Sequence, residues 1–129
     1  MIMAKKLKLF GAFFGMTAVI IGAFGAHTLA EQIDAESLRS FETGVKYQMY
    51  HALLLIILGF NLKTVRKTHS FVFYMIVIGI IMFSGSIYGL ATNGLTSFDF
   101  TTIAFITPIG GSLLILSWLL IFVSFLNKN

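Results

Sequence analysis

Two of the three histidines stand beside other polar residues in an otherwise apolar chain, where imidazole groups could bind a ligand or transfer a proton. His51 follows Tyr47 by four residues, so the two side chains share one face of a helix. Glu42 and Lys46 have the same spacing, in the order that favours an ion pair. Together with His51, the residues that we expect to form one polar site are His27, Glu42, Lys46, Tyr47, Tyr50, Ser86, Tyr88 and Thr107.

The types and spacing of these residues do not complete a metal centre or a catalytic set. His27, His51 and Glu42 include no short-spaced ligand pair, so we predict no metal site. Haem held between the two histidines has no further support, so we predict no cofactor. No Ser-His-Asp set is spaced for nucleophilic catalysis, so we predict no catalytic residue and do not expect an enzyme. His51 then has two open roles, a hydrogen-bond partner between helices or the centre of a binding site.

The segments that must position these residues are typical of a membrane protein. The chain of 129 residues is 57% hydrophobic and 11% charged, with a mean hydropathy of +0.92. A soluble domain carries about 25% charged residues, so this chain cannot cover a soluble globule with polar surface. It has no cysteine, which excludes disulfides and cysteine metal sites. We therefore expect a single transmembrane domain over residues 1–129.

Four apolar segments are each long enough to cross a bilayer as a helix, since a hydrocarbon core of about 30 Å needs roughly 20 helical residues. They lie at about 9–26, 45–62, 71–91 and 101–126. Only the second segment contains charged residues or histidine. The short alternating segments of a membrane β-barrel are absent from the sequence. The expected fold class is an all-α integral membrane four-helix bundle.

Basic residues divide unequally between the two sides of this bundle. One side would hold seven, namely Lys5, Lys6, Lys8, Lys63, Arg66, Lys67 and Lys128. The other side would hold only Arg39 and Lys46. The positive-inside rule therefore predicts a multi-pass plasma-membrane protein with both termini in the cytoplasm. The formal charge of +4 reflects this topology and contact with lipid headgroups, and we expect no nucleic-acid partner.

The N-terminal segment and the first connection each need a separate interpretation. The basic N-terminus and its apolar run resemble a signal peptide, but the 18 apolar residues exceed the usual 7 to 15 or so, so we expect a retained helix. In the first connection, Asp34 can cap a helix that begins at about Ala35. Leu38, Phe41 and Val45 form an apolar stripe along that helix. We expect an amphipathic helix at the outer interface that continues into the second segment.

The fourth segment has two possible starts. Thr107 can cap a helix whose first residue is Pro108, or Pro108 kinks a helix that begins near Thr101. Glycines with the spacing that lets membrane helices pack closely are Gly11 with Gly15 and Gly85 with Gly89.

Four short motifs occur in the order of one known family. They are Gly22 to His27, Glu42 to Gly44 with Tyr47 to His51, Ser84 to Tyr88, and Thr107 to Gly111. With them the chain resembles domain-of-unknown-function family 423, also called uncharacterised protein family 0382, from about Leu9 to Phe125. A small eukaryotic transmembrane family is similar. The resemblance implies a small integral plasma-membrane protein with four helices and no established activity.

Three functions are compatible with the sequence. The first is a structural or accessory membrane protein, which packs beside lipids, as a homo-oligomer or in a larger membrane complex, and small size and glycine-rich helix faces favour it. The alternative is a small-molecule or lipid-binding protein of the outer leaflet, with a polar site around His51. The third is a transporter protomer, which is less favoured because the cytoplasmic half offers no ionisable residue to continue a path.

Overall fold

Four long helices form the protein in a computed structural model, which describes residues 2–62 and 67–127. They are α1 (Ile2–His27), α2 (Ala35–Asn61), α3 (Lys67–Ala91) and α4 (Ile106–Leu126). Three 3-10 helices lie in the two loops, η1 (Leu29–Glu31), η2 (Asn93–Leu95) and η3 (Phe100–Ile103). The described ranges contain no strand. The structure therefore confirms the all-α bundle.

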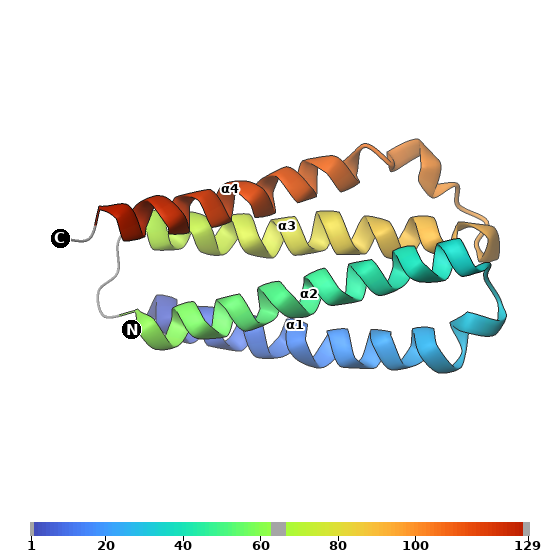
Figure 1. Cartoon of the computed structure of the whole chain (residues 1–129), viewed down its shortest axis with the longest axis horizontal. Coiled ribbons are helices and arrows are strands. Elements are labelled where there is room, and N and C mark those ends of the chain that lie inside the picture. The colour runs from blue at the N-terminus through green and yellow to red at the C-terminus, as the bar shows by residue number, and fades with distance from the viewer. Residues whose placement is uncertain (1, 63–66, 128–129) are drawn as a thin grey trace.

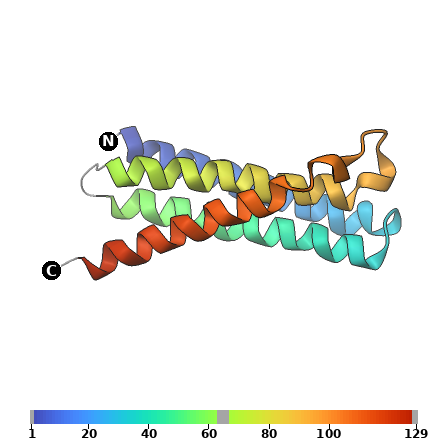
Figure 2. The same ribbon diagram turned by 90° about the horizontal axis from the view of Figure 1, so that it is seen from above.

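The helices run antiparallel as two hairpins (Figure 1). α1 packs along α2 and α3 packs along α4, while α2 and α3 join the two pairs. α1 begins and α4 ends at one end of the bundle, and the loops with the 3-10 helices lie at the opposite end. The view from above shows that α4 crosses the other helices obliquely (Figure 2). Because α4 packs mainly on α3, much of its surface is left outside the bundle.

Three segments of the described residues are long and apolar enough to cross a membrane, and they are Ile2–Glu31, Lys67–Ala91 and Phe100–Leu126. α2 has 27 residues, which corresponds to about 40 Å, so its length is also sufficient. Its composition is less apolar because Lys46, Gln48 and His51 lie in the half that follows the loop. Four crossings remain a prediction.

The starts of α1, α3 and α4 differ from the expected segments, and α3 begins four residues early, at Lys67. α1 begins seven residues before the expected segment, at Ile2, so the lysines of the N-terminus are helical. Lys8 packs its stem at Gly59 and holds its ammonium 5.0 Å from the centre of the Phe60 ring, which ties this end of α1 to α2. α4 begins at Ile106, so Pro108 lies in its first turn, where a missing N–H breaks no helical hydrogen bond. Pro108 is therefore neither the first helical residue nor a kink.

α2 begins at Ala35, as predicted, and continues without interruption to Asn61. Asp34 caps it by accepting a hydrogen bond of 2.7 Å from the backbone N–H of Ser37, and this bond lowers the pKa of its carboxyl group. The apolar stripe of the first turns packs inside the protein, since Phe41 is buried against Gly25 and the Tyr88 ring. Whether this stretch lies at the membrane interface stays a prediction.

Glycines lie where helices approach one another most closely. Not every glycine that we expected at such a contact lies at one. A Cβ atom on Gly11 would lie 2.8 Å from the carbonyl oxygen of Ala52, so a larger residue would force α1 away from α2. A Cβ atom on Gly85 would meet nothing within 4 Å. The expected packing role of Gly85 is therefore wrong, because α3 turns this residue outward.

Candidate functional site

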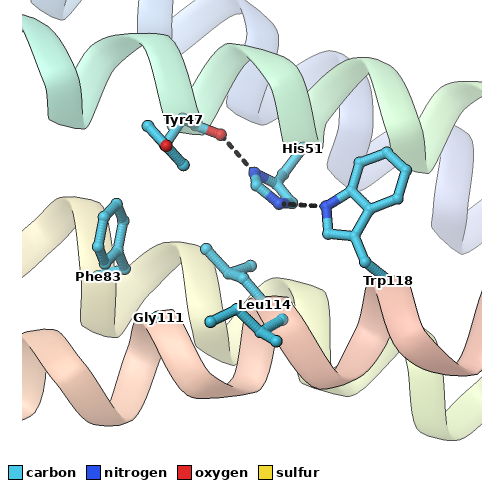
Figure 3. A pocket seen from close by; sticks show the side chains of 7 residues that line it. Tyr47, His51, Phe83, Gly111, Leu114 and Trp118 are labelled. Carbon is cyan, nitrogen blue, oxygen red and sulfur yellow. Dashed lines mark hydrogen bonds between the residues drawn. The ribbon is translucent and has the colours of Figure 1, made fainter.

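His51 is the buried imidazole of the bundle, with 3% of its surface exposed. The indole Nε1–H of Trp118, on α4, donates to its Nε2 atom at 3.0 Å (Figure 3). Because an indole N–H only donates, Nε2 must be the acceptor and Nδ1 carries the ring proton. Nδ1–H then donates to the carbonyl oxygen of Tyr47 at 2.7 Å. His51 is thus a neutral imidazole whose two ring nitrogens are both hydrogen-bonded. The bond to Trp118 confirms the expected hydrogen bond between helices.

A groove of about 280 Å³ lies beside this histidine, between α2 and α4 (Figure 3). Its lining residues are Tyr47, His51, Phe83, Gly111, Leu114, Ile115 and Trp118. The Tyr47 ring stacks on the imidazole, with 6.3 Å between the ring centres. It also packs against the Phe83 ring, with 5.2 Å between the ring centres. Tyr47 and Trp118 are each almost half exposed. The groove therefore has an aromatic and aliphatic wall with one fully bonded polar pair.

Gln48 forms a second polar group, which joins three helices. Its side chain is 4% exposed. Its Nε2 donates to the carbonyl oxygen of Phe14 at 3.0 Å and to the hydroxyl of Thr17 at 2.8 Å, both on α1. Its Oε1 accepts from the hydroxyl of Tyr88, on α3, at 2.7 Å. The bond to Phe14 is buried and the other two are partly buried, so Gln48 holds α1 and α3 to α2.

Serine hydroxyls form the third polar group, on α3. Ser84 donates to the carbonyl oxygen of Gly44 at 2.7 Å, which binds α3 to α2. Ser86 donates to the carbonyl oxygen of Phe83, one turn back, at 3.0 Å. Since this uses the only proton of the Ser86 hydroxyl, Thr107 is the donor in the hydrogen bond between Ser86 and Thr107. That bond joins α3 to the first turn of α4.

The expected site residues are thus divided among separate places. Tyr47 lies against His51, and Ser86 is bonded to Thr107. Tyr88 is bonded to Gln48, in the core between α1, α2 and α3. The other four expected residues are exposed, and they are His27, Glu42, Lys46 and Tyr50. Within residues 2–62 and 67–127, the hydrogen bonds therefore do not join the expected residues into one connected site around His51.

His27 and His51 lie at different levels of the bundle. Gly15 of α1 packs on Ala52, the neighbour of His51. His27 lies twelve residues further along α1, which corresponds to about 18 Å. The two imidazoles therefore cannot both ligate one haem iron.

The exposed charges of α2 do not complete a site either. Glu42 and Lys46 lie four residues apart on the helix surface, but within the described residues they do not form the expected ion pair. No group of three or more His, Cys, Asp or Glu residues in the described ranges could hold a metal ion.

Several residues that join helices were not among the expected site residues. They are Thr17, Gln48, Ser84 and Trp118. Gln48 had a usable signal, because an amide in an apolar segment must find partners in a bilayer. Trp118 had another, because the only tryptophan stands well inside the fourth segment and not at its ends, where membrane tryptophans are enriched.

Comparison with known proteins places the chain among small bacterial membrane proteins. The family model described as "Protein of unknown function (DUF423)" matches residues 21–111. A UPF0382 membrane protein of Staphylococcus saprophyticus is 39% identical over 92% of this chain and 95% of its own length. The UPF0382 membrane protein YwdK of Bacillus subtilis is 36% identical, over 93% and 95%. The UPF0382 inner membrane protein YgdD of Escherichia coli is 34% identical, over 93% and 88%. No solved structure matches the chain.

Proposed function

The chain belongs to the DUF423 family, and from this premise we propose that it is a structural or accessory protein of the plasma membrane. One observation carries the proposal. Every buried side-chain nitrogen or oxygen atom in the described part of the chain has a hydrogen-bond partner. Since a bilayer offers no water to polar groups, such bonds hold the helices together. The partners of the protein are then bilayer lipids and either further copies of itself or a larger membrane complex.

The direction of these hydrogen bonds favours a structural role over catalysis. The hydroxyl protons of Ser84 and Ser86 both go to backbone carbonyl groups, so neither oxygen is activated by a base. His51 accepts from Trp118 and donates to the backbone. To accept a substrate proton, its Nε2 would have to give up the only polar bond in the groove that joins α2 to α4.

The distribution of polar groups also favours a structural role over transport. The main core cluster, which includes Leu7, Leu55, Ile76 and Ile80, fills the half of the bundle near the termini with apolar side chains. A path for ions or protons needs polar groups at successive depths. Gln48 and the His51 to Trp118 pair lie near the middle of the bundle and the serine group lies nearer the loops. All three groups end in bonds to backbone or to each other.

Proton flux through reconstituted vesicles tests this proposal. With a pH-sensitive dye inside, we expect vesicles that contain the protein to leak protons no faster than protein-free vesicles. We expect His51→Gln to fold and to lose at most about 1–2 kcal/mol of stability, because glutamine can still accept from Trp118. A flux above the protein-free value that disappears in a folded His51→Gln variant would overturn the proposal.

We propose that both termini lie in the cytoplasm, because seven basic residues lie on that side of the bundle. The chain has no cysteine, so single cysteines can report each side. Thr68 and Thr96 are exposed and lie near opposite ends of α3. A membrane-impermeant maleimide should label Thr68→Cys only from the cytoplasm and Thr96→Cys only from outside. The reverse pattern would contradict the orientation, and labelling of both from one side would show that α3 does not cross.

A further inference from the structure

The groove between α2 and α4 opens sideways from the bundle, where a membrane protein meets lipid. Its floor is buried, since Leu114 is 4% exposed and Phe83 is partly covered. Its rim is open, with Ile115 69% exposed and Trp118 47% exposed. The opening exists because α4 packs mainly on α3, while the Trp118 side chain reaches across to His51 of α2. Whatever fills the groove is therefore drawn from the medium beside the helices.

Water is a poor occupant of this groove. A buried water needs two to four or so polar partners. The ring nitrogens of His51 and the indole N–H of Trp118 are already bonded. Among the described side chains of the lining, only the Tyr47 hydroxyl has no bond. An empty groove is also unfavourable, because its walls would lose their dispersion contacts.

The size of the groove selects among apolar occupants. A helix with its side chains is at least about 10 Å across, so a 10 Å length of it takes up roughly 800 Å³. The groove holds about 280 Å³, so a helix of a partner or of a second copy could cover it but not enter it. Pockets for drug-sized ligands begin at about 300 Å³, so a whole lipid molecule is also too large. A slender apolar chain remains.

We propose that the groove binds one acyl chain of a bilayer phospholipid. The acyl chain lies between α2 and α4 along the eight residues from Gly111 to Trp118, a length of about 10 Å. Gly111 is nearer the loops, and Trp118 lies about 18 Å from the start of α4 at Ile106. A lipid of the leaflet on the loop side therefore places the far carbons of its chain against the indole. The His51 to Trp118 bond fixes the indole there and keeps α2 and α4 at the spacing of one chain.

The single tryptophan makes this proposal measurable, because all of the tryptophan fluorescence comes from one residue at the rim of the groove. The probe is vesicles of dioleoylphosphatidylcholine mixed with a phosphatidylcholine brominated near its chain ends, which quenches tryptophan on contact. Gly111→Leu fills the groove from the loop side, and a Cβ atom at Gly111 lies at an ordinary 3.4 Å from the Phe83 ring. Gly85→Leu is the matched control, since Gly85 is exposed outside the groove with nothing within 4 Å of its Cβ position.

We expect Trp118 to be quenched less in Gly111→Leu than in the unaltered protein. In vesicles with half of the lipid brominated, one fewer contacting lipid leaves about twofold more fluorescence, because one fewer site must be free of bromine. Gly85→Leu should follow the unaltered protein. Equal quenching of all three folded proteins would overturn the proposal.

Native mass spectrometry of the unaltered protein tests the same proposal without a variant. We expect one phospholipid to stay with each protomer under activation that strips the remaining lipids. No retained phospholipid would overturn the proposal, as would a retained free fatty acid. A dimer that Gly111→Leu dissociates, with no lipid retained, would identify a second copy as the occupant and overturn it too.

Discussion

Replacing Gln48 with leucine is expected to destabilise the folded protein by about 2–4 kcal/mol. The change removes three hydrogen bonds, to the Phe14 carbonyl oxygen, the Thr17 hydroxyl and the Tyr88 hydroxyl. A side-chain hydrogen bond between membrane helices contributes on average about 0.6 kcal/mol and at most about 1.7 kcal/mol. The Tyr88 hydroxyl also loses its acceptor in a partly buried position, which adds to the loss.

Equilibrium unfolding in mixed detergent and sodium dodecyl sulfate, followed by circular dichroism, measures this effect. Gln32→Leu is the matched control, because Gln32 is the only other glutamine and its exposed side chain makes no hydrogen bond in the structure. We expect the control to change the free energy of unfolding by less than about 0.5 kcal/mol. Equal losses in the two variants would show that the Gln48 bonds contribute nothing beyond the change from amide to leucine.

The sequence could predict four helices because long uncharged segments leave few other structures in a bilayer. It could also place residues on a face of their own helix, and Tyr47 does lie against His51. It could not show which neighbour each face would meet. His51 points to α4, whereas Gln48, three residues earlier, points to α1 and α3. The expected single site is divided for this reason.

The sequence also could not show which glycines lie at contacts between helices. Gly85 and Gly89 have the spacing of close helix packing, but only Gly89 faces another element, the Phe100 ring in the loop before α4. The contact that brings α3 and α4 closest is at Gly110, where the backbone of α3 passes at Met82 and Phe83. The spacing along one helix shows which small residues share a face. Where two helices cross decides which of these residues lies at the contact.

Gly110→Ala is expected to destabilise the protein by about 2–3 kcal/mol, at the upper end of the usual effect of overpacking. Its Cβ atom would collide with the backbone nitrogen of Phe83 and would lie 2.8 Å from the carbonyl carbon of Met82. Backbone atoms inside a helix cannot rotate away as a side chain can, so α3 and α4 must separate. The hydrogen bond between Ser86 and Thr107, one turn away, would be stretched by the same movement.

Gly111→Ala is the matched control, because the two glycines are neighbours in the same helix. A Cβ atom at Gly111 lies 3.4 Å from the Phe83 ring, an ordinary contact with a side chain that can shift. Both substitutions gain the same helix propensity, up to about 1 kcal/mol, so the difference between them isolates the collision with α3. We expect Gly111→Ala to be neutral or slightly stabilising in the same unfolding measurement. If Gly110→Ala were equally neutral, α4 would have room to move away from α3, and the close approach at Gly110 would contribute nothing to the stability of the bundle.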